Sequence, residues 1–335
     1  MEKLSNHRSY DGIKLAIIGA GKWGKNHIRT ANSLLRSENI IVFDTNANAS
    51  EIVASVNSDI HFTTEIENVT NNKEINAVII SSPAETHYEL SREFIENGKN
   101  VLVEKPITLQ VDHAEELVEL SNNNNVKLMV GHVLLYHPAV EKIKEGINEG
   151  KIGTLQYLYS NRLNLGALRK EENVFWSFAP HDISLLQYII EDDPINIESF
   201  GAVYLQRDIE DTTLTYLEYP NNIRGHIHVS WLHPFKEQRL VVVGDEGMYV
   251  FEDTLKTDKL KLYKKGFKIG ENGFEKYDED FVSIELEDKM PLTEEHVHFY
   301  ASILNDTKPI TDGKHALQVL KILDAATKKL HKAAV

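Results

Sequence analysis

Short apolar runs alternate with amphipathic stretches through residues 1–131, and this alternation predicts a repeated strand–helix unit. Runs without polar positions are typical of parallel strands that helices cover on both faces. The expected strands are Lys14–Ile18, Ile40–Phe43, Ala77–Ser81, Asn100–Val103 and Lys127–Val130, and the expected helices are Lys25–Leu35, Glu51–Val56, His87–Asn97 and Val111–Ser121. Because such crossovers are right-handed, we expect a doubly wound parallel sheet that binds ligand at the carboxyl ends of its strands.

The pattern changes after Gly131. Helical periodicity covers His137–Gly150 and His181–Ile190, and strand patterns then follow one another with short turns, which is typical of an antiparallel sheet. These strands are Ile197–Gln206, Leu214–Tyr219, Ile223–Trp231, Arg239–Val243 and Met248–Glu252. The pattern of residues 132–335 therefore predicts an α+β domain with a large, mostly antiparallel open sheet. The amphipathic stretch His315–Leu330 is expected to pack back on the body of the protein. A second subunit is a common cover for the free face of such a sheet.

The stretch Lys14–His27 carries three glycines, Gly19, Gly21 and Gly24, in the G-x-G-x-x-G spacing directly after the first strand. In a dinucleotide site these glycines allow a tight turn, close approach of backbone to pyrophosphate, and close packing of helix on strand. Asp44 ends the second strand about 20 residues later, where a carboxylate can bind a ribose 2′-hydroxyl. Since this carboxylate would repel a 2′-phosphate and no cation follows it, we expect NAD rather than NADP.

Composition narrows the class of protein. A chain of 335 residues with 41% hydrophobic residues has room for two domains with real cores. The formal net charge of -15 argues against nucleic acid as a partner, and the absence of cysteine excludes disulfides and thiolate metal sites. The N-terminal residues have no signal-peptide pattern, and no run reaches the roughly 18 apolar residues of a membrane span. We therefore expect a cytoplasmic protein with no membrane partner.

Two residues outside the glycine turn could carry chemistry. Lys105, in Val101–Leu109, follows the fourth strand directly, where a nicotinamide would lie; a partly desolvated lysine suits proton transfer. His181 follows Pro180 and is expected to open a helix, with Asp182 as a helix-terminal charge. Histidine is the natural group for taking an alcohol proton at neutral pH. Taken alone, Lys105 could equally be a surface lysine, and His181 a structural histidine.

Taken together, these stretches resemble the Gfo/Idh/MocA oxidoreductase family, which includes glucose–fructose oxidoreductase and inositol dehydrogenase. The resemblance extends over nearly the whole chain, from the glycine turn through Ser81–Leu90, the Glu104-Lys105-Pro106 motif and the His181 helix to the tail Pro291–Ala326. It implies a Rossmann domain, a second domain with a mostly antiparallel sheet, and homodimers or homotetramers formed through that sheet. It also implies a catalytic lysine and histidine. Many relatives carry an aspartate four residues before the histidine, where this chain has Ser177, so an Asp–His pair is not expected.

The resemblance also implies the set of cofactor contacts. Ser81, Pro83 and His87 would line the nicotinamide half of the site. The complete expected set is Gly19, Gly21, Lys22, Trp23, Gly24, Asp44, Ser81, Pro83, His87, Glu104 and Lys105.

Within the family, Gly131–Val140, Ser160–Val174 and Trp176–Ser184 look most similar to bacterial UDP-sugar 3-dehydrogenases. A UDP-linked uronate such as UDP-N-acetylglucosaminuronate is thus the expected substrate, in the synthesis of surface polysaccharide, with Arg162, Asn164, Arg169 and His181 as its contacts. Guanidinium groups suit phosphate or carboxylate, although a solvated basic stretch would look the same. The alternatives are a free sugar or polyol, reduction of a ketosugar, and a non-catalytic NAD-binding sensor.

Two groups of histidines are candidates for a metal site. One group is His226, His228 and His233, and the other is His296 and His298. Residues i and i+2 of a strand share a face, but no acidic or cysteine ligand completes either set, so no metal site is expected.

Overall fold

The structure is a computed structural model that describes residues 10–166, 168–170 and 172–330. It divides into two compact units. The first comprises the chain up to Val133 together with Met290–Leu320, and the second comprises Leu134–Lys289 together with the chain from Lys321. The predicted boundary at residue 131 differs from this division, because the structure returns Met290–Leu320 to the nucleotide-binding unit.

The first unit is built on a parallel six-stranded sheet. Its strands are β1 (Leu15–Ile18), β2 (Ile40–Phe43), β3 (His61–Thr63), β4 (Ala77–Ile80), β5 (Asn100–Val103) and β6 (Leu128–Val130), in the order β3-β2-β1-β4-β5-β6. This order is the doubly wound arrangement predicted from the sequence, with its switch point between β1 and β4. The sequence pattern missed β3 because this edge strand has only three residues and begins at the exposed His61.

Helices connect and cover these strands. They are α1 (Gly24–Leu34), α2 (Ala49–Ala54), α3 (Glu67–Thr70), α4 (His87–Glu96) and α5 (Val111–Asn123). From the end of the chain, α8 (Pro291–Leu304) and the part of α9 (Gly313–Leu330) up to Leu320 belong to the same unit. The helix α8 packs against α1 and buries His296, Phe299 and Tyr300. After α8 the chain runs beside β6, where Val130 N–H donates to Thr311 O at 2.8 Å. These contacts explain why Met290–Leu320 belongs to the first unit.

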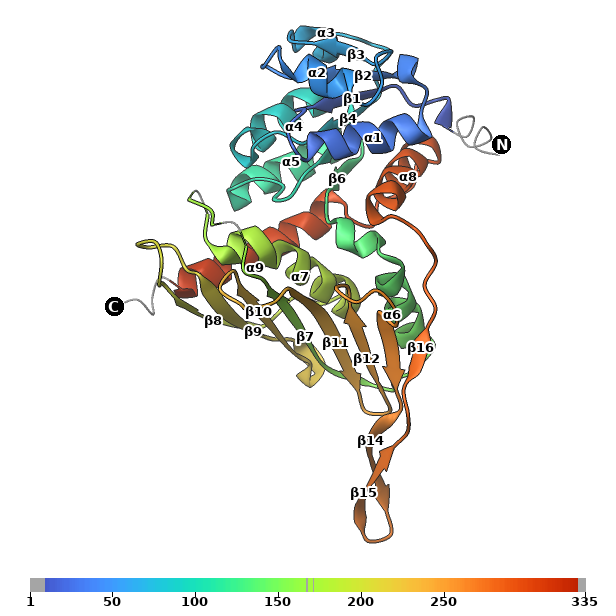
Figure 1. Cartoon of the computed structure of the whole chain (residues 1–335), viewed down its shortest axis with the longest axis vertical. Coiled ribbons are helices and arrows are strands. Elements are labelled where there is room, and N and C mark those ends of the chain that lie inside the picture. The colour runs from blue at the N-terminus through green and yellow to red at the C-terminus, as the bar shows by residue number, and fades with distance from the viewer. Residues whose placement is uncertain (1–9, 167, 171, 331–335) are drawn as a thin grey trace. The chain divides into compact units, whose positions relative to one another are not determined.

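The second unit contains a mostly antiparallel eight-stranded sheet, as predicted. Its strands are β7 (Leu155–Leu163), β8 (Asn196–Ala202), β9 (Thr212–Glu218), β10 (Arg224–Ser230), β11 (Glu237–Gly244), β12 (Met248–Glu252), β13 (Leu260–Tyr263) and β16 (Val282–Ile284), in the order β16-β13-β12-β11-β7-β10-β9-β8. The central strand β7, which the sequence pattern did not give as a strand, pairs in parallel with β10. A separate hairpin of β14 (Lys265–Gly270) and β15 (Gly273–Asp278) projects from this unit (Figure 1).

Two helices of this unit, α6 (Pro138–Asn148) and α7 (Val174–Ile190), lie along one face of the sheet (Figure 1). The start of α7 corrects the prediction that His181 opens a helix. Pro180 lies inside α7, and the helix begins seven residues before His181, where the Asn173 side chain accepts a hydrogen bond from Trp176 N–H at 3.0 Å. An interior proline costs about 3 kcal/mol, and we attribute its tolerance to this cap and to complete burial of Val174 and Phe175. Within the described residues, no helix is long and apolar enough to cross a bilayer.

Candidate active site

The glycine turn between β1 and α1 has a conformation that side chains at two of its glycines would disrupt. Gly19 has a φ of +95°, which disfavours any residue with a Cβ atom. A Cβ atom on Gly24 would lie 2.0 Å from Gly19 O, so α1 could not approach the turn as closely as it does. At Gly21 a Cβ atom would meet nothing within 4 Å, which leaves the backbone open to a pyrophosphate. The turn thus fits the dinucleotide site that its spacing predicts.

A cavity of about 530 Å³ opens beside this turn at the carboxyl ends of β1, β2 and β4. It brings together five of the predicted cofactor residues, Gly19, Gly21, Asp44, Ser81 and Pro83. Residues that the sequence pattern did not single out complete its wall, and they are Ile18, Phe43, Thr45, Ile66, Ser82, Glu85, Thr86, Glu89 and Leu90. The lining includes three carboxylates and no lysine or arginine, which suits a ribose with free hydroxyls better than one with a 2′-phosphate.

Asp44 is held in place by backbone donors. Its Oδ2 accepts from Ala20 N–H at 2.8 Å and its Oδ1 from Asn46 N–H at 2.9 Å. These bonds link the end of β2 to the glycine turn and fix the carboxylate at the cavity wall. Each oxygen retains a lone pair that can accept from a ribose hydroxyl.

Ser81 and His87 connect neighbouring strand ends. Ser81 Oγ lies 3.0 Å from Gly19 O and 3.2 Å from Ile18 O, so it ties β4 to the turn. His87 is buried, with Nδ1 2.7 Å from Pro106 O and Nε2 3.0 Å from Ser82 O. Burial lowers the pKa of His87, although the two carbonyl oxygens act in the opposite direction. Both ring nitrogens thus contact backbone, and His87 braces the loop that carries Lys105.

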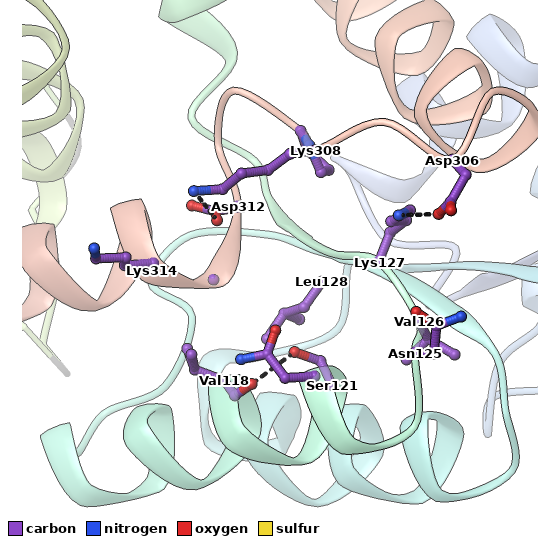
Figure 2. Close-up of a pocket in the computed structure, with 13 residues that line it drawn as sticks. Val118, Ser121, Asn125, Val126, Lys127, Leu128, Asp306, Lys308, Asp312 and Lys314 are labelled. Atoms are coloured by element: carbon purple, nitrogen blue, oxygen red, sulfur yellow. Dashed lines mark hydrogen bonds and ion pairs between the residues drawn. The ribbon is translucent and has the colours of Figure 1, made fainter.

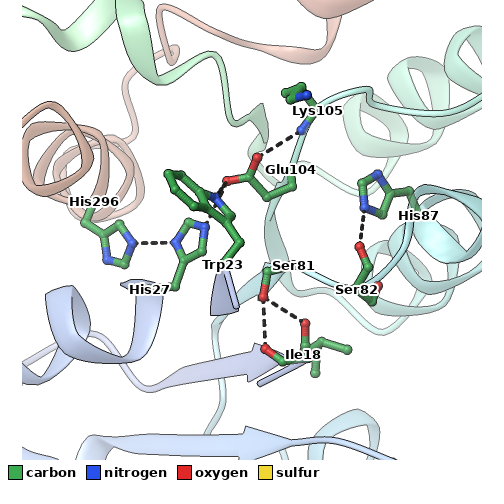
Figure 3. A network of polar contacts seen from close by, with 10 residues as sticks. Ile18, Trp23, His27, Ser81, Ser82, His87, Glu104, Lys105 and His296 are labelled. Carbon is green, nitrogen blue, oxygen red and sulfur yellow. Dashed lines mark hydrogen bonds and ion pairs between the residues drawn. The ribbon is translucent and has the colours of Figure 1, made fainter. Parts of the chain in front are cut away.

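Glu104 and Lys105 follow β5 directly, as predicted, at the ligand-binding edge of the sheet. Glu104 accepts hydrogen bonds from Trp23 Nε1–H and from His27 Nε2–H, the latter at 2.9 Å (Figure 3). Burial raises the pKa of Glu104, but the bonds from His27 and Trp23 and the charge of Lys105 outweigh it and leave this pKa below its usual range. Trp23 therefore connects the glycine turn to the motif that carries Lys105. Lys22 is exposed in the same turn.

A chain of buried side chains continues behind Glu104. His27 Nδ1 lies 2.8 Å from His296 Nε2, and His296 Nδ1 lies 3.0 Å from Tyr300 Oη. One direction of donation satisfies every atom: Tyr300 donates to His296, His296 to His27, and His27 to Glu104. Burial lowers the pKa of His296 well below its usual range, consistent with a neutral ring. This chain orients Glu104, and sequence reasoning missed it, although His27 stands inside the glycine stretch.

In the second unit, His181 is half-buried on α7, next to a buried ion pair. The carboxylate of Asp182 is fully buried and accepts from Arg162 Nε at 2.8 Å, from Arg162 Nη2 at 3.1 Å, and from Ser160 Oγ at 2.5 Å. Asp182 is therefore not a helix-terminal charge, and its partner Arg162 projects from β7. The guanidinium predicted to hold substrate is 11% exposed and already bidentate with a carboxylate.

The other predicted substrate contacts follow β7. Asn164 is half-buried, and its backbone N–H donates to Ser230 O at 3.0 Å. Arg169 is exposed, with Nε 4.0 Å from Glu172 Oε1. Of these residues the structure thus pairs Arg162 with Asp182 in the second unit, which also carries His181, while Lys105 belongs to the first unit.

The histidines considered as metal ligands have other contacts. His226 stacks on Tyr159 with ring centres 4.9 Å apart, and His298 Nε2 accepts from Ile310 N–H at 3.0 Å. Across the described part of the chain, no group of three or more histidine, aspartate or glutamate side chains is arranged to hold a metal ion.

Comparison with known proteins agrees with this architecture. Residues 13–132 match the model of the oxidoreductase family with an NAD-binding Rossmann fold, and residues 140–250 match the GFO/IDH/MocA C-terminal domain. The structure of levoglucosan dehydrogenase, in complex with NADH and levoglucosan, superposes with a TM-score of 0.82 at 17% identity, over 96% of this chain and 98% of that one. At this identity the likeness shows the fold alone.

Two relatives of known activity are similar in sequence. The scyllo-inositol 2-dehydrogenase (NAD⁺) of Bacillus subtilis is 26% identical, with 73% of this chain and 75% of the relative covered. The UDP-N-acetylglucosamine 3-dehydrogenase of Acidithiobacillus ferrooxidans is 25% identical, with 76% and 78% covered, and its structure superposes with a TM-score of 0.82 at 20% identity, over 96% of this chain and 98% of that one. The two family models together match more than half of the chain. The chain therefore belongs to the Gfo/Idh/MocA oxidoreductase family, and its cofactor is NAD.

Proposed function

We propose that this protein is an NAD-dependent dehydrogenase that oxidises a secondary hydroxyl of a nucleotide sugar. The observation that carries the reaction class is Lys105, a lysine at the carboxyl end of β5 in the same unit as a cavity that fits NAD. Bound NAD⁺ would accept a hydride from the carbon that bears the hydroxyl. Side chains of the protein would then orient that hydroxyl and take its proton.

Lys105 and His181 are the proposed proton-handling groups. In its neutral form the lysine amine can take the hydroxyl proton. Glu104 stands beside Lys105 and is oriented by Trp23 and His27, which supports a fixed position for the lysine motif. His181 is the second proposed catalytic group, with the role of orienting the hydroxyl. Ser177 precedes it by one helical turn, so the aspartate of many relatives is not available to orient the imidazole.

The proposed substrate is a UDP-linked sugar of the UDP-N-acetylglucosaminuronate type, oxidised at its 3-hydroxyl. The support is the relative that acts on UDP-N-acetylglucosamine and the exposed guanidinium of Arg169. A guanidinium can hold a diphosphate or a uronate carboxylate with two parallel hydrogen bonds. Arg162 is the weaker of the two proposed contacts, because its guanidinium is committed to Asp182.

A second candidate substrate is a cyclitol or another free polyol. It is favoured by the scyllo-inositol 2-dehydrogenase relative, which covers a similar share of the chain. The same Lys105 chemistry would apply, and Arg169 would then have no anion to bind.

We also propose that the protein is a homo-oligomer joined through the large sheet. Tyr157, Phe200, Leu214 and Tyr216 are exposed on strands of this sheet, and Phe200 stands directly opposite Leu214. Apolar side chains on an open sheet face are typical of an interface between subunits. Analytical ultracentrifugation tests this, and a monomer at micromolar concentration would contradict it.

Turnover assays test the function. NADH formation is measured with UDP-N-acetylglucosaminuronate, UDP-N-acetylglucosamine, scyllo-inositol and myo-inositol. The proposal expects the highest kcat/KM with the uronate. A preference for an inositol would favour the polyol reading, and NAD binding without turnover of any compound would favour a sensor.

A further inference from the structure

Two histidines of the first unit, His132 and His315, contact each other, and His132 leaves the strand next to that of Lys105. The strands β5 and β6 pair in parallel with Val103 opposite Val130, and Gly131 N–H donates to Val103 O at 2.8 Å. Two residues further along each strand stand Lys105 and His132, so they leave the same edge of the sheet on neighbouring strands. After burial and His315, the charge of Lys105 contributes to lowering the pKa of His132.

His132 is buried without a hydrogen bond. It is 2% exposed, and neither of its ring nitrogens has a hydrogen-bonding partner among the described residues. An unsatisfied buried polar group costs about 1–3 kcal/mol, which a purely structural residue would avoid. Such an imidazole is therefore a candidate for a role in the reaction.

His315 contacts His132 and is less buried than it. Their ring centres are 5.6 Å apart in an edge-to-face arrangement, and His315 Nε2 is likewise buried without a partner among the described residues. His315 is only partly buried, and it stands in the first turn of α9, where its backbone N–H donates to Asp312 Oδ1 at 2.9 Å. Asp312 in turn pairs with Lys308 at 2.9 Å.

Asp312 and Lys308 line a polar hollow of about 480 Å³ between α5, the start of β6 and the start of α9 (Figure 2). The Lys308 side chain is 70% exposed, so solvent reaches this hollow. Lys105 and His132 thus leave neighbouring strands at the ligand-binding edge, the His132 ring contacts the His315 ring, and Asp312, which holds the His315 backbone, lines a hollow that water reaches.

We propose that His132 and His315 conduct the proton of the oxidised alcohol from Lys105 to the polar hollow. This inference rests on the proposed function, because Lys105 must first take that proton. Bound NAD⁺ would accept the electron pair of the C–H bond as hydride, and the O–H proton passes to Lys105 Nζ. Lys105 then gives a proton to one nitrogen of His132, while the other nitrogen of that ring gives one to His315, directly or through a bridging water. His315 releases a proton to the hollow, so one proton leaves for each alcohol oxidised.

The surroundings of both rings favour their neutral form. Burial, followed by the charges of His315 and Lys105, lowers the pKa of His132 well below its usual range. Repulsion from Lys105 ends once Lys105 has given up its proton, so the transfer itself makes His132 a better acceptor. Burial lowers the pKa of His315 to about 4, where Asp312 acts to raise it and Lys308 to lower it. A proton is therefore not trapped on either ring at neutral pH.

Steady-state kinetics test the path with His132→Gln and His315→Gln. Glutamine is polar, but unlike an imidazole it cannot accept a proton at one nitrogen while it releases a proton from another. Both variants should bind NAD normally and lose about 10²-fold in kcat, with a larger solvent isotope effect, and added imidazole should restore part of kcat in His315→Gln. The control is His113→Gln on α5, whose half-buried ring stacks on Tyr88 with ring centres 3.8 Å apart. Unchanged kcat in both variants, or a loss explained by weaker NAD binding, would refute the path.

A second measurement does not depend on turnover. Histidine resonances are titrated by NMR in the wild type and in Lys105→Met, with assignments from the glutamine variants. The pKa of His132 should rise when the charge of Lys105 is removed, while that of His113 stays constant. An unmoved His132 would show that the two groups do not communicate. If no sugar is oxidised but His132 does respond, the proposed function fails and the contact between Lys105 and His132 stands.

Discussion

Asp44 gives the sharpest prediction of cofactor choice. Its carboxylate lies at the wall of the proposed NAD cavity and is held by Ala20 and Asn46. In Asp44→Ala, one charge-assisted hydrogen bond to the ribose is lost, which is worth about 1.5–3 kcal/mol, or about a 10–150-fold weaker NAD affinity. NADP should gain, because a 2′-phosphate about 4 Å from a carboxylate is repelled by about 4 kcal/mol per unit charge at an effective dielectric of 20, before salt screening. Glu85 and Glu89 remain, so the variant should lose its preference without reversing it.

Asp44→Asn is the matched control. Its amide oxygen can still accept from Ala20 N–H, so the turn keeps its shape while the negative charge is removed. Isothermal titration of NAD and NADP with the three proteins measures both affinities. The wild type should bind NAD more tightly than NADP. Asp44→Asn should chiefly improve NADP binding, and Asp44→Ala should in addition weaken NAD binding. Equal affinity of the wild type for the two cofactors would refute the reasoning.

Three further predictions concern other residues. Arg162→Ala should destabilise the fold by about 3–5 kcal/mol in urea titrations, because it leaves the Asp182 carboxylate buried without its cation. Arg169→Ala should leave the free energy of unfolding unchanged and raise the KM for a UDP-sugar. The reverse pattern would exchange the roles of the two arginines. The free energy of unfolding should fall as pH drops from about 6.5 to about 4, because His315 binds a proton at higher pH in the unfolded chain than in the folded protein. His315→Gln should remove up to about 3 kcal/mol of that pH dependence. Identical pH profiles for the wild type and the variant would contradict the burial of His315. The kcat losses of Lys105→Met and His181→Ala should combine to less than their product if the two groups act as one unit, and a fully multiplicative loss would indicate independent roles.

Local sequence patterns predicted the parts of the candidate site that depend on residues close together in the sequence. Gly19 and Gly24 are required by one turn, and Asp44 and Lys105 each follow a strand whose apolar pattern is unambiguous. The parallel sheet and the antiparallel sheet were predicted for the same reason, since each strand type has its own hydrophobic pattern.

Long-range pairings were not predictable from one sequence. His27 and His296 are 269 residues apart, and only the packing of α8 on α1 brings them together. The Arg162–Asp182 pair depends on how α7 packs on β7. Because the sequence alone does not give this packing, it predicts Arg162 as a substrate contact and Asp182 as a helix-terminal charge. The start of α7 was misplaced because Pro180 is a strong local breaking signal, which burial of the surrounding helix overrides.

The most direct test of the account is NADH formation by the wild type and by Lys105→Met, with UDP-N-acetylglucosaminuronate as substrate and with NAD binding measured in parallel. Lys105 lies outside the glycine turn and the Asp44 contact, so the variant should fold and bind NAD. We expect it to lose about 10²–10⁴-fold in kcat. Near-normal turnover by Lys105→Met would contradict the assigned site.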